Sequence, residues 1–193
     1  MSNQTVRIIG GKWRGKKIGF PEVAGLRPTP DRVKETLFNW LMHNIADSRC
    51  LDLFAGSGSL GFEACSRGAK AVVLVEQQPK VVQALKQTLG AFGVDAGITV
   101  VNASALLWLK QNASAAFDVV FLDPPFQEGL LMPTLKLLQE HRWLHAKSLV
   151  YVEYAVGTDV AEIKMCWEVV KHKKMGAVEC ALLKPLAMIL FTD

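Results

Sequence analysis

Short apolar segments alternate with amphipathic segments along most of this chain, and this alternation most constrains its fold. From residue 49 onward, buried strands are predicted at residues 49–54, 71–76, 98–101, 117–122 and 149–154. The segments between them carry apolar side chains at helical spacing, at residues 58–66, 79–92, around Leu106 and Leu109, and at residues 130–140. Repeated β-α-β units predict a mostly parallel sheet with helices on both faces, which is a Rossmann-like α/β fold.

The two ends of the chain depart from this repeat. Residues 167–174 and 177–183 are strand-like and are separated by Met175-Gly176, which predicts an antiparallel hairpin at the sheet edge. Residues 6–20 alternate and are rich in glycine and lysine, which predicts a β-hairpin outside the main core. Trp13 of this segment has two interpretations: it stacks on a nucleic-acid base, or it packs the hairpin against the body.

A helix start is indicated at Thr29-Pro30-Asp31. Thr29 is a suitable cap, Pro30 fits the first helical position, and Asp31 lies near the positive end of the helix dipole. We therefore expect a basic hairpin extension over residues 1–28 and a single α/β domain over residues 29–193.

Composition excludes several classes of protein. The chain has 193 residues, which fits one domain, and no apolar run approaches the ~18 residues needed to span a membrane. The first residues lack the apolar stretch of a secretory signal. The four cysteines are scattered without a CxxC pair, and the four histidines form no recognisable ligand set. We expect a reduced cytoplasmic protein without a metal site.

Positive charge is concentrated near the N-terminus. Residues 1–35 have a net charge of +5, so that the other 158 residues carry −1 in total. This imbalance favours contact with a polyanion, although a solvated surface explains it equally well. The eight basic side chains of this segment are Arg7, Lys12, Arg14, Lys16, Lys17, Arg27, Arg32 and Lys34.

A glycine-rich loop follows the first predicted strand of the domain. Gly56, Gly58 and Gly61 fit the GxGxxG pattern, in which glycines let a ligand approach the backbone at a helix N-terminus. We expect Phe54 and Ser57 to contact the same ligand. The loop alone also fits a dinucleotide-binding fold.

Two carboxylates near this loop indicate a different ligand. Asp52 lies near the end of its strand, where an acid suits a cationic ammonium group better than a pyrophosphate. Glu76 ends the next strand, twenty residues after Gly56, where a carboxylate can accept hydrogen bonds from both hydroxyls of a ribose. Ser104 follows the third strand, either beside an adenine ring or as a solvent-facing helix cap. These positions predict S-adenosylmethionine as the ligand.

The fourth strand ends in Asp123-Pro124-Pro125-Phe126. Because proline lacks an N–H group, this turn presents acceptors without competing donors. The Asp123 carboxylate and a backbone carbonyl could hold the two N–H groups of a planar amine, while Phe126 stacks on its ring. The arrangement predicts direct transfer of a methyl group to an amino nitrogen, with Asp123 stabilising the developing charge. No cysteine is placed for the covalent attack that cytosine-C5 chemistry requires.

Four blocks of this sequence resemble the RsmD family. They are residues 7–15 (RIIGGKWRG), residues 26–40 (LRPTPDRVKETLFNW), the glycine loop at residues 52–61, and the turn at residues 123–126. The resemblance extends from about residue 6 to residue 184. The two N-terminal blocks are its specific part, because the loop and the turn occur in many methyltransferases.

The resemblance implies a methyltransferase that modifies the exocyclic N2 of a guanine in 16S rRNA, within an assembled or nearly assembled 30S subunit. It implies a class I fold with a seven-stranded sheet and an antiparallel C-terminal hairpin. It also assigns roles by position. The cofactor would be held by Asp52, Gly56, Gly58 and Glu76, with Ser104 near its adenine; the guanine would be held by Asp123, Pro124 and Phe126; and the RNA would be contacted by Arg7, Lys12, Arg14, Arg27 and Arg32. We expect a monomer that relies on neighbouring ribosomal proteins and does not contact a membrane.

Other functions remain open from the residues alone. The Asp-Pro-Pro-Phe turn suits any planar amine, so an adenine-N6 DNA methyltransferase or a glutamine-N5 protein methyltransferase is an alternative. The chain has little spare length for the target-recognition region that such DNA enzymes carry. A non-catalytic RNA-binding module with an inherited fold is an alternative of another class, and an NAD-dependent dehydrogenase is the least favoured.

Overall fold

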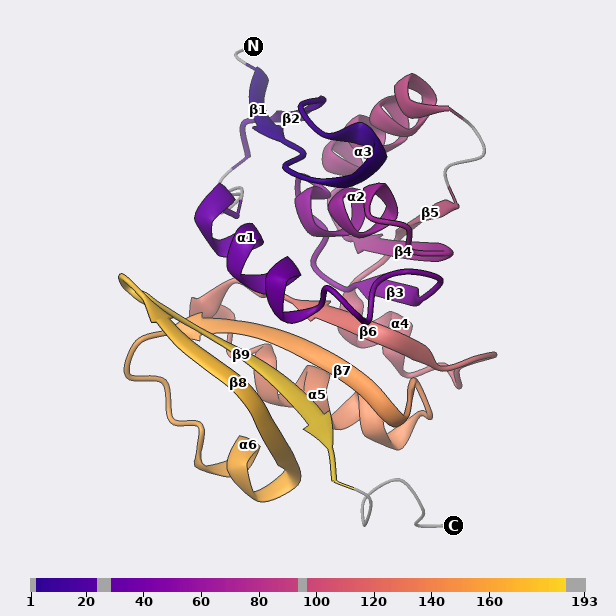
Figure 1. Ribbon diagram of the computed structural model, residues 1–193. Coiled ribbons are helices and arrows are strands. Elements are labelled where there is room, and N and C mark those ends of the chain that lie inside the picture. The colour runs from indigo at the N-terminus through magenta and orange to yellow at the C-terminus, as the bar shows by residue number, and fades with distance from the viewer. Residues whose placement is uncertain (1–2, 24–28, 94–96, 187–193) are drawn as a thin grey trace.

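A seven-stranded sheet runs through the centre of the molecule, as the computed structural model in Figure 1 shows; it describes residues 3–23, 29–93 and 97–186. The strand order is β5-β4-β3-β6-β7-β9-β8. The strands are β3 (Arg49–Asp52), β4 (Ala71–Glu76), β5 (Ile98–Asn102), β6 (Phe117–Leu122), β7 (Leu144–Ala155), β8 (Trp167–Met175) and β9 (Val178–Pro185). The first five pair in parallel, and β9 runs antiparallel to both β7 and β8. The predicted α/β fold with a C-terminal antiparallel hairpin is confirmed.

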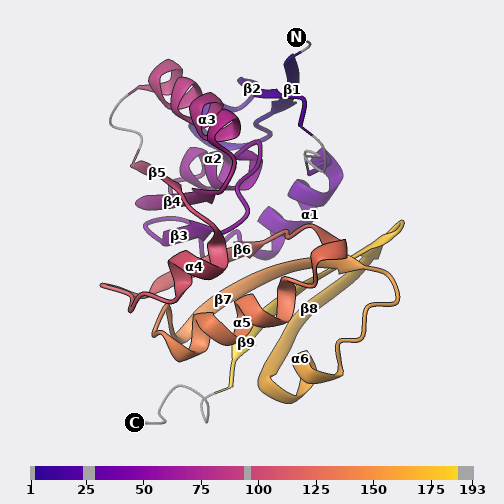
Figure 2. The ribbon, with the colours of Figure 1, turned by 180° about the vertical axis from the view of Figure 1, so that it is seen from behind.

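Helices cover both faces of this sheet. Two hydrophobic clusters fill the spaces between helices and sheet, one beneath α1, α2 and α3 and the other beneath α4, α5 and α6. Figure 2 shows the second group from behind. The helices are α1 (Asp31–Trp40), α2 (Ser59–Ser66), α3 (Pro79–Phe92), α4 (Ala105–Leu109), α5 (Leu131–Glu140) and α6 (Ala161–Cys166), with short 3-10 turns η1 (Gly11–Trp13) and η2 (Phe126–Glu128). None of the helices in the described ranges could cross a membrane.

The central strand β6 shows why its residues 119–122 are all apolar. Val119 and Phe121 point into the α1–α3 cluster, whereas Val120 and Leu122 point into the α4–α6 cluster. Successive side chains of a strand alternate between its two faces, and here both faces are buried. A continuous apolar run is therefore needed at this position.

The N-terminal hairpin packs on the same core. β1 (Asn3–Arg7) and β2 (Lys17–Pro21) form a separate antiparallel sheet, but their buried side chains belong to the α1–α3 cluster. The prediction that the hairpin lies outside the main core is thus wrong. Trp13 is 7% exposed, and its ring centroid lies 4.8 Å from that of Phe92, so the packing interpretation of Trp13 is confirmed. The boundary at residue 28 stays a prediction.

Polar contacts fix this hairpin to the end of α2. The buried Glu63 carboxylate accepts a hydrogen bond from the backbone N–H of Ile9 at 2.8 Å, and Ser66 Oγ accepts one from the N–H of Trp13 at 2.9 Å. Gly11 has φ +73°, and a Cβ there would lie 1.9 Å from the carbonyl oxygen of Ser66. Glycine is therefore required at position 11 both because the hairpin backbone lies close to that of α2 and because the backbone conformation is left-handed.

The start of α1 differs from its prediction. Pro30 occupies the N-cap position without a side-chain capping bond, and its carbonyl accepts hydrogen bonds from the N–H groups of Val33 and Lys34. Thr29 does not cap the helix; its Oγ1 instead accepts a hydrogen bond from Ser59 Oγ at 3.3 Å. The helix start thus contacts the start of α2, which the local sequence pattern could not indicate.

Substitution of Gly61 tests the packing of α2 on the sheet. A Cβ at position 61 would lie 2.2 Å from Leu74 Cδ2 and 3.2 Å from Val72 Cγ1, both of which are buried. We expect Gly61→Ala to lower the free energy of unfolding by about 1–3 kcal/mol, measured by urea denaturation. Gly90→Ala is the matched control, because this helical position has nothing within 4 Å and alanine favours a helix. Equal stability of the two variants would contradict the proposed packing constraint.

Candidate active site

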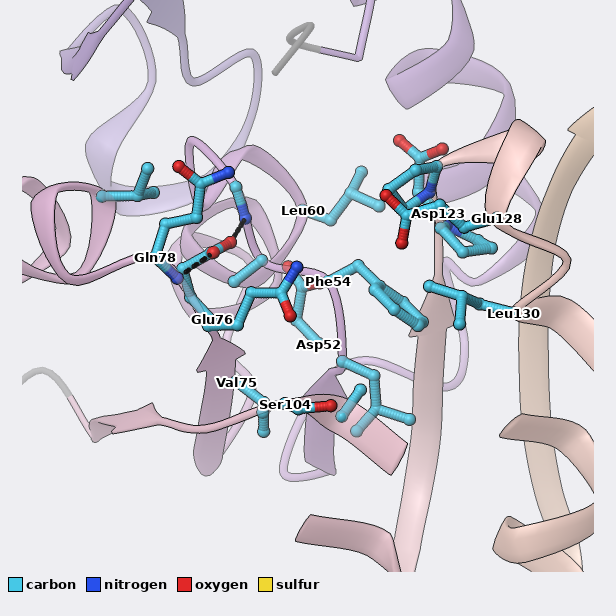
Figure 3. Close-up of a pocket in the computed structure, with 18 of the residues that line it drawn as sticks. Asp52, Phe54, Leu60, Val75, Glu76, Gln78, Ser104, Asp123, Glu128 and Leu130 are labelled. Atoms are coloured by element: carbon cyan, nitrogen blue, oxygen red, sulfur yellow. Dashed lines mark hydrogen bonds between the residues drawn. The ribbon is translucent and has the colours of Figure 1, made fainter. Parts of the chain in front are cut away.

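A cavity of about 770 Å³ opens at the carboxyl ends of the parallel strands β3, β4 and β6. This is the edge where open α/β sheets bind ligands. The loop after β3, the end of β4, the start of α4 and the turn after β6 form its walls (Figure 3). Four acids line the cavity, and no basic side chain in the described part of the chain does so; the acids are Asp52, Glu76, Asp123 and Glu128. The cavity therefore favours a ligand that carries positive charge.

The glycine loop takes a shape that other residues would resist. Gly56 and Gly58 have φ of +49° and +77°, in the left-handed region that favours glycine. A Cβ at position 58 would also lie 2.7 Å from side-chain atoms of Leu85 and Phe62. Gly58 is the N-cap of α2, which begins at Ser59 and not at the predicted residue 58. Ser59 and Leu60, at the start of α2, line the cavity, whereas Gly58 does not.

Asp52 lies at the base of the cavity, where its side chain is 3% exposed. Its Oδ2 accepts a hydrogen bond from the backbone N–H of Gly61 at 3.2 Å, which ties the end of β3 to α2. Burial raises the pKa of the Asp52 carboxyl to about 7, and the neighbouring Asp123 carboxylate raises it while the Gly61 hydrogen bond lowers it. A cation placed beside Asp52 would relieve this buried charge.

Glu76 joins the glycine loop to the end of β4. Its Oε2 accepts a hydrogen bond from the N–H of Gly56 at 3.0 Å, and its Oε1 accepts one from the N–H of Gln78 at 2.7 Å (Figure 3). The Asn102 side chain donates to the carbonyl oxygen of Glu76 at 3.0 Å, a contact that the sequence did not suggest. Ser104 is the N-cap residue of α4, makes no side-chain capping bond, and lines the cavity. Ser104 thus stands at the helix-cap position that was the alternative, but its side chain makes no capping hydrogen bond.

The Asp-Pro-Pro-Phe turn leaves β6 on the opposite wall. Pro124 is buried, whereas Phe126 begins η2 and is 43% exposed. Burial raises the pKa of Asp123 to about 6, so its carboxylate is largely ionised at neutral pH. The ring of Phe54 points across the cavity toward the side formed by Asp123 and Leu130 (Figure 3). The structure thus brings the predicted cofactor residues other than Gly58, and the predicted base-holding residues, to one cavity.

The predicted RNA-binding side chains lie elsewhere. Arg7 forms an ion pair with Asp31 at 2.9 Å, and Lys12 lies 4.5 Å above the Trp13 ring. Arg14 and Arg32 are exposed. None of these side chains lines the cavity. Arg27 falls outside the described residues.

Glu153 is a residue of this site that the sequence analysis missed. It lies on β7, is 5% exposed, and its Oε1 accepts a hydrogen bond from Tyr151 Oη at 2.8 Å. Phe121 pairs with Tyr151 and Leu122 with Val152, so the parallel register places Glu153 next to Asp123. A single acid within the strand predicted at residues 149–154, whose other residues are aliphatic or tyrosine, was the signal that could have revealed it. Burial, reinforced by the Asp123 carboxylate, raises the pKa of Glu153 to about 8.

Comparison with known proteins agrees with this geometry. Residues 6–184 match the family described as Conserved hypothetical protein 95. The chain is 48% identical over 179 residues to ribosomal RNA small subunit methyltransferase D of Haemophilus influenzae, covering 92% of each chain. It is 44% identical over 173 residues to the Escherichia coli K12 protein of that name, covering 90% of this chain and 86% of the relative.

The chain belongs to the RsmD family. A solved structure from Escherichia coli, described as a methyltransferase, superposes with a TM-score of 0.84 at 43% identity and covers 95% of this chain and 99% of its own. A Haemophilus influenzae structure described as a methylase gives a TM-score of 0.80 at 44% identity, with coverage of 95% and 99%. The class I methyltransferase fold implied by the resemblance is therefore confirmed. No group of His, Cys, Asp or Glu side chains in the described residues is arranged to hold a metal ion.

The buried Glu153 makes stability depend on pH in a defined direction. An unfolded glutamate has a pKa near 4.3, so between about pH 4.3 and the folded-state pKa of about 8 the folded protein keeps a proton that the unfolded chain has lost. Glu153 therefore lowers the free energy of unfolding as pH rises through this window. Glu153→Gln, which retains an acceptor for Tyr151, should gain stability relative to the parent protein between pH 5 and pH 9, by at most a few kcal/mol.

Urea unfolding at pH 5, 7 and 9 measures this difference. Glu140→Gln is the control, because Glu140 is an exposed residue at the end of α5. A stability difference between Glu153→Gln and the parent that is constant over this pH range would show that Glu153 does not hold the proton.

Proposed function

We propose that this protein transfers a methyl group from S-adenosylmethionine to the exocyclic N2 amine of a guanine in 16S rRNA. The observation that carries this proposal is that the Asp123–Phe126 turn and the glycine loop face the same acidic cavity. A donor site and an acceptor site for one methyl group can therefore coexist in it. The guanine and the 16S rRNA come from the resemblance to the RsmD family, whose relatives described above carry names that refer to small-subunit rRNA.

The cofactor half of the cavity fits S-adenosylmethionine. When bound, the cofactor supplies a methyl group made electrophilic by its positively charged sulfur. Asp52 would pair with the ammonium group, Glu76 would accept hydrogen bonds from the ribose, and Ser104 would lie beside the adenine. Backbone groups of the glycine loop would hold the rest of the cofactor. These groups belong to Phe54, Gly56, Ser57 and Gly58.

The acceptor half fits a planar amine. The Asp123 carboxylate and the Pro124 carbonyl would accept the two N–H groups of the amine, which directs the nitrogen lone pair toward the methyl group. Pro124 and Pro125 add no N–H donors that compete for these acceptors. The half-exposed ring of Phe126 offers a face on which the base stacks. As the new bond forms, Asp123 stabilises the positive charge on nitrogen and is placed to accept the proton that the amine loses.

The substrate is expected to be the RNA in its ribosomal setting. We propose that the protein acts as a monomer on an assembled or nearly assembled 30S subunit, with neighbouring ribosomal proteins completing the binding site. The predicted RNA-binding residues Arg7, Arg14 and Arg32 lie outside the cavity, so they would contact RNA that flanks the modified base.

Methyl transfer to 30S subunits from a strain that lacks this gene tests the proposal. Labelled methyl groups should appear on one guanine N2, located by nuclease mapping and mass spectrometry. DNA and protein substrates run in parallel distinguish the adenine-N6 and glutamine-N5 alternatives. The proposed function would be refuted if subunits from the deletion strain contained as much methylguanine as subunits from the parent strain.

Asp123→Asn tests the acceptor site. Asparagine keeps the size of the side chain but replaces one acceptor oxygen by a donor and removes the charge, so kcat should fall roughly 10²–10³-fold. Binding of S-adenosylhomocysteine and the thermal midpoint should change little, which separates a chemical defect from a folding defect. A non-catalytic RNA-binding protein would retain its biological activity with this substitution.

Asp52 should make cofactor binding depend on pH. A pKa of about 7 means that the carboxyl is protonated at lower pH and loses its attraction for an ammonium group. The affinity for S-adenosylhomocysteine should therefore fall as pH drops from 7.5 to 5.5, by about tenfold per pH unit at most. Calorimetric titrations of the parent protein and Asp52→Asn measure this. The variant should bind weakly at every pH, and a parent affinity that does not vary with pH would contradict the pairing.

A further inference from the structure

A second group of basic side chains lies far from the N-terminus in sequence. β8 forms one edge of the sheet, and its second half carries Lys171, Lys173 and Lys174, all of them exposed. Lysines on an edge strand often serve only to prevent strand pairing between molecules. The position of these lysines relative to the cavity indicates a role beyond the prevention of strand pairing.

The sheet register places these lysines at the level of the reacting centre. Glu153, which lies beside Asp123, pairs with Cys180, and Cys180 pairs with Lys173. The four side chains therefore form a row across β6, β7, β9 and β8. Lys173 is three strand spacings from Asp123, which corresponds to about 14 Å along the sheet.

Two of the lysines share the face that α1 covers. Lys171 pairs with Leu182 and Lys173 with Cys180, and both partners pack into the α1–α3 cluster. Directly paired residues of neighbouring strands point to the same face of a sheet. Lys174 pairs with Glu179 and so points to the other face.

α1 brings a further basic residue to this surface. Lys173 Nζ donates a hydrogen bond to Thr36 Oγ1 at 3.4 Å, and Thr36 Oγ1 donates to the carbonyl oxygen of Arg32 at 3.1 Å. The exposed Arg32 lies one turn before Thr36, toward the cavity end of the helix. Figures 1 and 2 agree that the tip of the β8–β9 hairpin projects on the same side as the N-terminal end of α1.

We propose that Arg32, Lys171 and Lys173 form a surface that binds the phosphate backbone of the substrate RNA beside the nucleotide whose base enters the cavity. This inference rests on the proposed function. The cavity itself is lined by acids, so it repels phosphate, while the three cations, which lie outside it, attract phosphate. RNA is thereby held across the mouth of the cavity, and a single unstacked base is the part that enters.

The triple variant Arg32→Gln, Lys171→Gln, Lys173→Gln tests this surface. Binding of a fluorescent RNA oligonucleotide should weaken about tenfold or more at 0.1 M salt, because each phosphate contact releases counterions. The slope of log affinity against log salt should decrease by about two to three for the three lost contacts. In methyl transfer, the KM for 30S subunits should rise, whereas the affinity for S-adenosylhomocysteine should not change.

The control variant is Lys70→Gln, Lys110→Gln, Lys147→Gln, which removes the same charge from three exposed lysines just before β4, at the end of α4 and near the start of β7. Equal effects of the two triple variants on RNA affinity and salt slope would overturn the proposal. A defect that appears only with intact subunits, and not with the RNA oligonucleotide, would also overturn it and would assign the surface to a ribosomal protein. If the parent protein binds RNA but methylates no subunit, the proposed function fails while the RNA-binding measurement still tests this surface.

Discussion

Parallel pairing of β3 with β4 and β6 is the constraint on which the rest of the site depends. Because the three strands run in the same direction, their carboxyl ends meet at one edge of the sheet. Asp52, Glu76 and Asp123 stand at those ends, although they are far apart in the sequence. The antiparallel strand β9 then positions β8 so that its basic end reaches the same edge.

This convergence of acids opposes the stability of the protein without ligands. Burial raises the pKa values of Asp52, Asp123 and Glu153, which means that the fold disfavours their charged forms. Asp52 and Glu76 are held by backbone N–H groups, and Glu153 is held by the Tyr151 hydroxyl. A cationic ligand in the cavity would offset the remaining repulsion. The cost to stability is thus tied to the binding of positive charge, as is common in functional sites.

Much of the fold could be predicted because its signals are local. The apolar run of β6 and the glycines at positions 56 and 58 indicate a buried strand and a tight loop from neighbouring residues alone. The features that were missed depend on residues distant in sequence. Glu153 becomes part of the site only through the register of β6 and β7, and Thr29 contacts Ser59 instead of capping its own helix. The hairpin joins the core because its side chains, including Trp13, fit against α2 and α3, which no local pattern describes.

The short helix α2 connects the N-terminal hairpin to the cavity. Glu63 and Ser66, near the end of α2, hold the backbone of the hairpin, while Ser59 at its start lines the cavity. An eight-residue helix spans only about 12 Å, and all residues of α2 are buried. Close packing therefore leaves α2 little freedom to move between the hairpin and the cavity. The backbone of the hairpin is therefore fixed relative to the glycine loop by these hydrogen bonds and by packing. The same holds on the other side of the cavity, where the register of β7, β9 and β8 fixes Lys173 relative to Asp123. Rigid elements on both sides thus set the distance between the charges that would contact RNA and the group that would hold the base.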